Sequence, residues 1–199
     1  ALETGGPADA VHAHAHLVRR QVGVVDEVQP LHRGQQVILR RAGIGRVDGG
    51  GNRVTEQKFR GKYMLVFFGF THCPDICPPT LLLMDHVLTK LGKTADKVTP
   101  IFITIDPERD SPQVVKDYAQ NFGERIVPLT GTKEEIERVK DAYKVFASKV
   151  EAPTSSAGDY SMDHSGFIYL MGPDGKYVAH FAQNTPETKL AEQLKAAIR

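Results

Sequence analysis

The stretch that decides the fold runs from Tyr63 to Phe70 and reads YMLVFFGF. Every residue in it is apolar, aromatic or glycine, and no polar residue interrupts the run. A run of this length and composition is typical of a strand that is buried on both faces of a sheet. The segment that follows, from Thr71 to Pro79, contains three prolines and both cysteines of the chain, and it predicts a loop.

Helical and strand patterns alternate after this loop. The first predicted elements are a helix at 80–91, a strand at 99–106, a helix from Ser111 to Phe122 and a strand at 126–129. A helix then starts at a Thr132–Glu135 capping box and ends near Phe146. Strands at 166–171 and 177–183, joined by a turn at 172–175, are followed by a last helix from Thr185–Pro186 to Ala197. Residues 149–163 are polar, and a loop is predicted there. Strand–helix units that end in an antiparallel hairpin and a helix predict an α/β fold, with helices on both faces of the sheet.

The first part of the chain differs in composition from the rest. Residues 1–60 contain eight Arg, one Lys and a single aromatic residue, Phe59, whereas the remainder contains four Arg, twelve Lys and fourteen aromatic residues. A segment without aromatic residues buries little apolar surface. We therefore expect residues 1–46 to be a poorly ordered or aberrant extension and residues 47–199 to form the domain. The domain would begin with a turn at 49–51 that leads into a strand at Val54.

The overall composition argues against two functional classes. A net charge of +1 gives no electrostatic case for a nucleic-acid partner or for binding to a membrane surface. The chain also has no apolar run of roughly 18 residues, the length that a transmembrane helix requires. The charged fraction of 25% and the hydrophobic fraction of 41% are those of a globular protein.

Cys73 and Cys77 lie at the predicted turn between a buried strand and a helix, with three residues between them. The partial positive charge of a helix N-terminus favours the thiolate form of a nearby cysteine. With this spacing the two sulfurs can face one point and bind a metal, or they can form a disulfide. The alternative is that both are small buried hydrophobic residues, which fits poorly with the prolines around them.

Polar residues elsewhere are further candidates. His164 ends a polar segment just before a predicted strand and is a candidate metal ligand, although a lone histidine is more often structural. Asp106 and Asp110 follow another predicted strand. Three interpretations of them remain open: polar support close to the cysteine loop, a docking surface for another protein, or a turn followed by a helix cap at Asp110 or Ser111.

Two other groups of residues are weaker candidates. Asp163 either orients His164 or is a solvated carboxylate, and Met162 is either a soft metal ligand or a packing residue. The alternating histidines near the start of the chain are either a metal-binding tract or part of an unordered polar stretch, and the second interpretation is favoured. They are His12, His14 and His16.

Several motifs together resemble the Sco family of copper-binding proteins, which serve the assembly of cytochrome c oxidase. They are the run from Gly61 to Phe70, CPDICP at 73–78, DPERDSP at 106–112, LTGT at 129–132 and YSMDH at 160–164. The resemblance covers about Asn52 to Arg199. It implies a thioredoxin-like fold, with a central mixed sheet flanked by helices and with extra hairpins.

The resemblance also implies one copper ion, Cu(I) or Cu(II), held by Cys73, Cys77 and His164. It implies a copper chaperone whose partner is the copper-bearing subunit of cytochrome c oxidase or another copper chaperone. Family members face the periplasm at the inner membrane, or the mitochondrial intermembrane space, and membrane attachment is expected only through an anchor missing from this chain. Two thiolates and an imidazole suit Cu(I), although zinc accepts the same ligands.

Three functions remain open, and whether the protein is an enzyme remains open with them. They are a copper chaperone, a thiol–disulfide oxidoreductase that acts on the acceptor's cysteines through Cys73 and Cys77, and a thiol peroxidase. Three residues between the cysteines count against an ordinary thioredoxin, which has two. A peroxidase needs one cysteine of low pKa and has no need of His164.

The composition of residues 1–46 also suggests how this segment arose. The change in the ratio of Arg to Lys and the loss of aromatic residues are what a GC-rich coding region gives when it is translated in the wrong frame. We expect this segment to be a frameshifted translation, with a divergent natural extension as the alternative. Translation of the upstream DNA in the other two frames tests this expectation.

Overall fold

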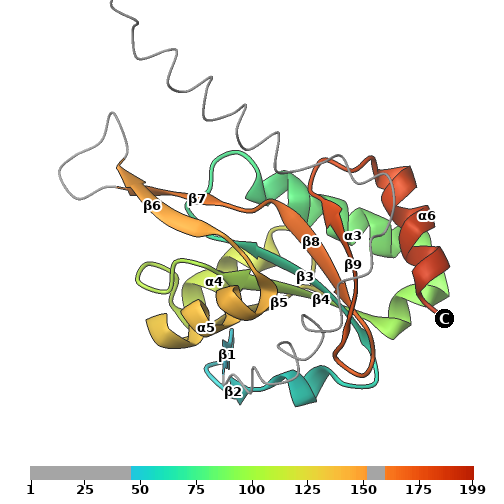
Figure 1. Ribbon diagram of the computed structural model, residues 1–199, viewed down its shortest axis with the longest axis horizontal. Coiled ribbons are helices and arrows are strands. Elements are labelled where there is room, and N and C mark those ends of the chain that lie inside the picture. Colours follow the sequence, from blue (N-terminus) through green and yellow to red (C-terminus); the bar gives the residue numbers. More distant parts are fainter. Residues whose placement is uncertain (1–45, 152–159) are drawn as a thin grey trace, which may run out of the picture. The chain divides into compact units, whose positions relative to one another are not determined.

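A computed structural model describes residues 46–151 and 160–199 (Figure 1). The expectations for the N-terminal extension and for its three histidines therefore lie outside the described residues. Within the described ranges, no helix has the length and apolar character needed to cross a lipid bilayer.

Seven strands form one mixed sheet in the order β2-β1-β5-β4-β3-β8-β9. The strands are β1 (Arg46–Asp48), β2 (Arg53–Val54), β3 (Tyr63–Gly69), β4 (Val98–Thr104), β5 (Val127–Thr130), β8 (Phe167–Met171) and β9 (Tyr177–Ala182). The three central strands β3, β4 and β5 are parallel, and the outer strands pair antiparallel. The run that opened the sequence analysis is thus an interior strand with a neighbour on each side, as its apolar character predicts.

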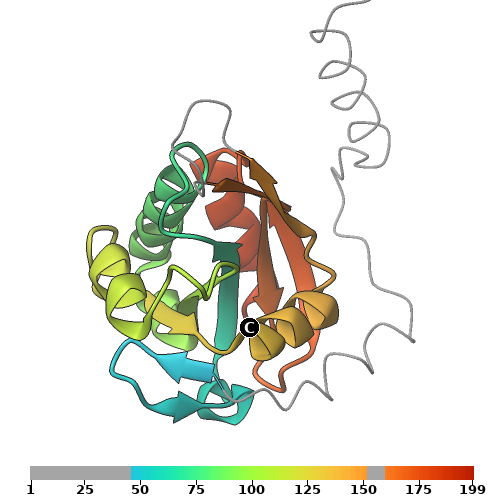
Figure 2. The same cartoon turned by 90° about the vertical axis from the view of Figure 1, so that its left-hand side faces the viewer.

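Helices cover both faces of this sheet. They are α3 (Cys77–Leu91), α4 (Pro112–Gln120), α5 (Lys133–Tyr143) and α6 (Glu187–Ala197), with 3-10 helices η1 (Glu56–Phe59) and η2 (Gly92–Lys97). Figure 2 shows α3 and α4 on one side of β3 and α5 on the other, and α6 packs beside α3. The predicted α/β class, a central mixed sheet flanked by helices, is confirmed.

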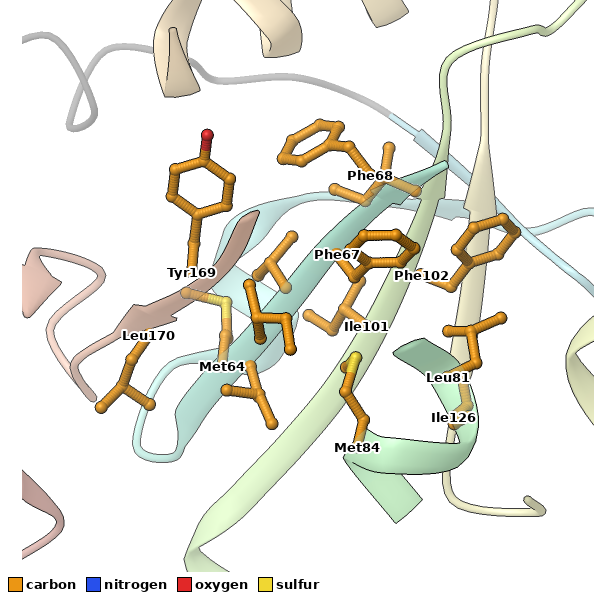
Figure 3. Close-up of a cluster of buried hydrophobic side chains, with 14 of the residues drawn as sticks. Met64, Phe67, Phe68, Leu81, Met84, Ile101, Phe102, Ile126, Tyr169 and Leu170 are labelled. Atoms are coloured by element: carbon orange, nitrogen blue, oxygen red, sulfur yellow. The ribbon is translucent and has the colours of Figure 1, made fainter. Parts of the chain in front are cut away.

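The two faces of β3 bury different aromatic clusters. Phe67 pairs with Phe102 of β4 across the ladder, and both rings are fully buried. Figure 3 shows Leu81 and Met84 of α3 pointing toward these strands. On the opposite face, Phe68 packs edge-on against a tyrosine of α5. Burial of side chains of this size stabilises the folded state by roughly 2–3 kcal/mol each.

One predicted loop is wrong at both of its ends, at residues 149–151 and 160–163, which are the part of it that the structure describes. Residues 149–163 were expected to be irregular, but β6 (Ala147–Glu151) and β7 (Tyr160–His164) form a separate two-stranded antiparallel sheet. In β7 only Tyr160 and Met162 are apolar residues that alternate with polar ones, and a pattern this short within a polar stretch does not identify a strand. Pairing between the two strands, from Ala147 opposite His164 onward, supplies the order that the sequence pattern lacks.

Four helix ends also differ from the prediction, and one of them is that of α4, which ends at Gln120 rather than at Phe122. Helix α3 begins at Cys77 rather than at residue 80, because prolines are tolerated in a first helical turn. Helix α5 ends at Tyr143, three residues before the predicted Phe146, where Lys144 adopts a left-handed conformation with φ of 57°. The last helix, predicted from Thr185–Pro186, begins at Glu187, and Pro186 occupies the N-cap of α6 without a side-chain capping bond.

Candidate metal centre

The cysteines lie where β3 ends and α3 begins. The loop between Gly69 and Cys77 turns back on itself, with the Cys73 amide bonded to the Phe70 carbonyl at 3.2 Å. Cys77 is the first residue of the helix and has no exposed surface, and Cys73 is 7% exposed. The loop and the helix N-terminus together thus hold both sulfurs near the carboxyl end of an interior strand, where α/β proteins commonly bind ligands.

His164 reaches the same place from the other sheet. It is the last residue of β7, and its ring packs edge-on against the rings of Phe67 and Phe70, at centroid distances of 6.2 and 5.9 Å. Its Nδ1 lies 3.2 Å from the Ser165 carbonyl oxygen. A carbonyl only accepts hydrogen bonds, so Nδ1 donates in this contact, and Nε2 is the ring nitrogen that faces the sulfurs. Nε2 lies 3.7 Å from the Cys77 sulfur.

The structure therefore brings together the three residues that the sequence singled out. Their ligand atoms, two Sγ and one imidazole nitrogen, all lie within 4.8 Å of one another. Three ligands at about 2.0–2.3 Å from a common ion would be separated by about 4 Å. The donor set therefore fits a metal ion after small side-chain adjustments. We call Cys73, Cys77 and His164 the candidate metal site.

The two thiols differ in acidity because they share a hydrogen bond. The bond from Cys77, aided by His164 and by the backbone amides of Cys77 and Ile76, lowers the pKa of Cys73 from 9.0 to about 4, against the effect of burial. The same bond raises the pKa of Cys77, and burial and the charge on Cys73 raise it further. At neutral pH the pair holds one thiolate, on Cys73, and one thiol that donates to it.

Asp110 supports the cysteine loop. Its carboxylate, with no exposed surface, accepts hydrogen bonds from the Thr71 amide at 3.1 Å, the Thr71 hydroxyl at 2.6 Å and the Thr104 hydroxyl. The helix cap that was an alternative role belongs to Ser111, whose hydroxyl accepts from an amide in the first turn of α4. Of the sequence alternatives, polar support close to the cysteine loop describes Asp110 best.

Asp106 contacts β7, the strand that ends at His164. Its carboxylate accepts the Tyr160 hydroxyl at 2.7 Å and binds the Arg109 guanidinium. Arg109 also donates to the Tyr160 carbonyl at 2.9 Å, and its guanidinium carbon lies 3.7 Å from the centre of the Tyr160 ring. The carboxylate is 1% exposed, so two close partners satisfy a charge that would otherwise be costly to bury.

The weaker candidates next to His164 have ordinary surroundings. Asp163 is exposed, which agrees with a solvated carboxylate. Met162 packs against the hydrophobic core, which agrees with a packing residue. Along β7 the side chains alternate, so Met162 and His164 share one side of the strand and Asp163 takes the other.

Sequence reasoning missed the residues that hold the site together. Thr71 was treated only as the start of a loop, and Tyr160 was placed in an irregular segment. Arg109 was quoted only within a motif. A signal was available in that motif, because Arg109 lies between two acidic residues that the structure buries. A buried carboxylate needs a donor, and a flanking Arg is the nearest source.

The fold and the site together define a class: a thioredoxin-like α/β domain with two cysteines and a histidine convergent at the end of a central strand. Comparison with known proteins gives the family. The sequence model of the SCO1/SenC family matches residues 46–199, six residues earlier than the start expected from the resemblance. The chain belongs to the SCO1/SenC family.

Relatives and solved structures agree with this assignment. The human protein SCO1 homolog, mitochondrial, is 39% identical over 151 residues, which are 75% of this chain and 50% of that protein. The structure of Bradyrhizobium japonicum ScoI with copper bound is similar with a TM-score of 0.70 at 42% identity, over 77% of this chain and 96% of that one. The structure of BsSco, described as a member of the Sco family of cytochrome c oxidase assembly proteins with a disulfide switch, is similar with a TM-score of 0.56 at 29% identity, over 77% and 90%. The chain spans about half the length of its human relative.

Proposed function

We propose that residues 47–199 form a copper-binding domain that delivers copper to the copper centre of cytochrome c oxidase or matures that centre. The convergence of Cys73, Cys77 and His164 within 4.8 Å is the observation that carries this proposal. Two sulfur donors and an imidazole suit Cu(I). Copper-bound relatives of the same fold favour copper over zinc, which accepts the same donors.

The site suits a cargo ion that must later leave. Cys73 is already a thiolate at neutral pH, so it offers a charged first ligand without losing a proton. Cys77 loses its proton as the ion replaces the hydrogen bond between the two sulfurs, so copper binding releases a proton. Because the ligands come from a loop and from the end of a separate strand, the site can open between them.

Membership in the family supports a proposal for the partner and for the location. The copper-bearing subunit of the oxidase, or another copper chaperone, is the expected acceptor or donor. The human relative is mitochondrial by name, and a Rickettsia felis relative is 38% identical over 149 residues. We propose the bacterial periplasm at the inner membrane, with the mitochondrial intermembrane space as the alternative.

Anaerobic titration with Cu(I) in competition with a chelator tests this function. Replacement of any ligand, as in His164→Ala, should lower the affinity by more than about 100-fold, because a two-coordinate remnant loses both geometry and charge balance. His86→Ala is the matched control, since His86 is an exposed histidine of α3 whose nearest acidic partner is Glu187. An unchanged affinity and spectrum in His164→Ala would show that the three-ligand site is wrong.

A second function is favoured by the short distance between the two sulfurs, which lie within 4.8 Å of each other, and by the lowered pKa of Cys73. The Cys73 thiolate can attack a disulfide of an acceptor protein and release one acceptor cysteine as a thiolate. Cys77, after losing its proton, then attacks the mixed disulfide and releases the second cysteine. The chain loses two electrons and becomes a disulfide, and the acceptor gains the same two electrons. Such a thiol–disulfide exchange would prepare the acceptor's cysteines for copper.

A further inference from the structure

The two halves of the candidate metal site lie on separate sheets. The cysteine loop follows β3 of the seven-stranded sheet, whereas His164 ends β7 of the two-stranded sheet. In the ranges 46–151 and 160–199, no backbone ladder joins β7 to the larger sheet. At its C-terminal end β7 is tied by the chain itself, because β8 begins three residues after His164. The N-terminal end of β7 needs another attachment.

Tyr160, the first residue of β7, provides that attachment through three of its parts. Its hydroxyl donates to Asp106, its carbonyl accepts from Arg109, and its ring lies under the Arg109 guanidinium. Because Asp106 and Arg109 also bind each other, each of the three side chains contacts the other two. We call them the Tyr160 clamp. The Arg109 guanidinium also lies 5.9 Å from the centre of the Phe70 ring, and Lys149 Nζ lies 4.2 Å from the centre of the Tyr160 ring. A clamp that fixes hydroxyl, ring and backbone leaves one end of the His164 strand little freedom to shift.

The same short loop holds the other half of the site. Asp110, four residues after Asp106, binds both the amide and the hydroxyl of Thr71, which lies two residues before Cys73. The backbone amide of Asp110 bonds to the Asp106 carbonyl at 3.0 Å, so the ends of the loop are fixed to each other. A five-residue turn thus contacts both the cysteine loop and the histidine strand.

We infer that the turn at 106–110 sets the distance between His164 and the two sulfurs, with Asp106 and Arg109 positioning His164 through Tyr160 and Asp110 positioning Cys73 through Thr71. That this distance governs metal affinity rests on the proposed function. Groups that orient metal ligands commonly change affinity by about 10–100-fold when they are removed. The turn acts by placement, since its side chains contact neighbours of the ligands.

Metal affinity in paired variants tests the inference. Arg109→Leu and Tyr160→Phe should each lower Cu(I) affinity by about 10–100-fold in the wild-type chain. In a His164→Ala background, Arg109→Leu should cost less than about threefold more, because the residue it positions is gone. Thr71→Val acts on the cysteine loop, so its effect should persist in that background.

Glu108→Gln is the matched control for the same turn. Glu108 pairs with Lys133 and Lys149 on the exposed surface, and such pairs contribute little. Lys149 Nζ lies 4.2 Å from the centre of the Tyr160 ring, and Lys149 itself is unchanged in this variant. Its affinity should stay within about twofold of the wild type. If Arg109→Leu lowers affinity equally with and without His164, the clamp acts on general stability and the inference is overturned.

A measurement on the metal-free protein separates this inference from the proposed function. The His164 ring lies against Phe67 and Phe70, so its proton resonances carry their ring-current shifts. Arg109→Leu and Tyr160→Phe should move these resonances toward random-coil positions, and Glu108→Gln should leave them in place. Tyr160→Phe removes one oxygen and keeps the ring, so it remains informative if Arg109→Leu does not fold. Unmoved His164 resonances in Tyr160→Phe would overturn the inference even if copper binds as proposed, and moved resonances would uphold it even if copper does not bind.

Discussion

Gly69 and Cys77 approach each other so closely that no side chain fits between them. A Cβ atom built on Gly69 would lie 2.5 Å from the Cys77 sulfur and 3.1 Å from the rings of Phe67 and Phe102. The glycine interrupts the apolar run that decides the fold, one residue before its end. A glycine inside a strand often marks a close approach of another group, and here that group is a sulfur of the candidate metal site.

Gly69→Ala adds only one methyl group, but it should impair the candidate metal site substantially. The new methyl group must displace the Cys77 sulfur or the two buried rings, and overpacking of this kind costs about 1–3 kcal/mol of the free energy of unfolding. We expect a fall in Cu(I) affinity of at least about tenfold, measured by competition with a chelator.

Gly172→Ala is the control for this substitution. Its added Cβ would meet the exposed Asp174 carboxylate at 3.2 Å, at the opposite end of β8 from the site. Chemical denaturation should show a smaller loss of stability there, and copper affinity should not change. Wild-type affinity in Gly69→Ala would mean that the sulfur has room to move without consequence.

The lowered pKa of Cys73 makes a prediction about reactivity. A thiol with a pKa near 4 is a thiolate throughout the neutral range, so its alkylation rate should be flat between about pH 6 and 8. An ordinary thiol would react about tenfold faster with each pH unit in this range. The rate for Cys73 should fall only as the pH drops toward its pKa, where the thiolate becomes protonated. Iodoacetamide labelling of the metal-free protein, read by mass spectrometry, gives the profile.

Removing the bond from Cys77 tests the cause of this shift. In Cys77→Ala the thiolate loses its main donor, so the pKa of Cys73 should rise toward 9.0 and the rate should climb steeply with pH. In Cys77→Ser the hydroxyl can still donate, so the profile should lie between the other two. Identical profiles for the alanine and serine variants would show that hydrogen bonding does not set the acidity of Cys73.

Asp110 should be important for stability as well as for placement. Its buried carboxylate accepts three hydrogen bonds, so Asp110→Ala leaves the donors of Thr71 and Thr104 without their acceptor. We expect a loss of about 2–4 kcal/mol in the free energy of unfolding, measured with urea. Asp117→Ala, at an exposed carboxylate bonded to Gln113, should change stability by less than about 0.5 kcal/mol. A small effect at Asp110 would mean that water replaces the carboxylate.

Much of the fold could be predicted because local patterns agree with the tertiary structure. The apolar run from Tyr63 to Phe70 predicts a buried strand, and the structure has one there. The capping box is also confirmed, because the Thr132 hydroxyl accepts from the Glu135 amide while the Glu135 carboxylate accepts from the Thr132 amide. The strand that ends at His164 could not be predicted. Its order comes from pairing with β6 and from the clamp at Tyr160, and both partners lie elsewhere in the sequence.

The candidate metal site likewise has one part that the sequence predicts from local pattern and one part that it does not. The cysteine pair could be recognised from its position before a helix, because neighbours in sequence are neighbours in space there. His164 could be brought to the pair only through the family resemblance, since 87 residues separate it from Cys77. No local pattern gives the register between β6 and β7, because that register depends on two segments that lie apart in the sequence.

The last prediction concerns the oxidised state of the metal-free protein. The sulfurs of Cys73 and Cys77 already lie within 4.8 Å, and a disulfide requires about 2.05 Å, so a modest movement of the loop suffices. Oxidised glutathione should therefore convert the pair to an intramolecular disulfide, with two reduced glutathione molecules released per chain. Bound Cu(I) should protect both thiols from oxidation and from alkylation, because each sulfur is then a metal ligand. Thiol counting before and after copper loading measures this protection, and Cys77→Ser, which keeps the reactive Cys73, should form only a mixed disulfide. Thiols that stay free in the metal-free protein would argue against the exchange function and leave copper binding as the role of the pair.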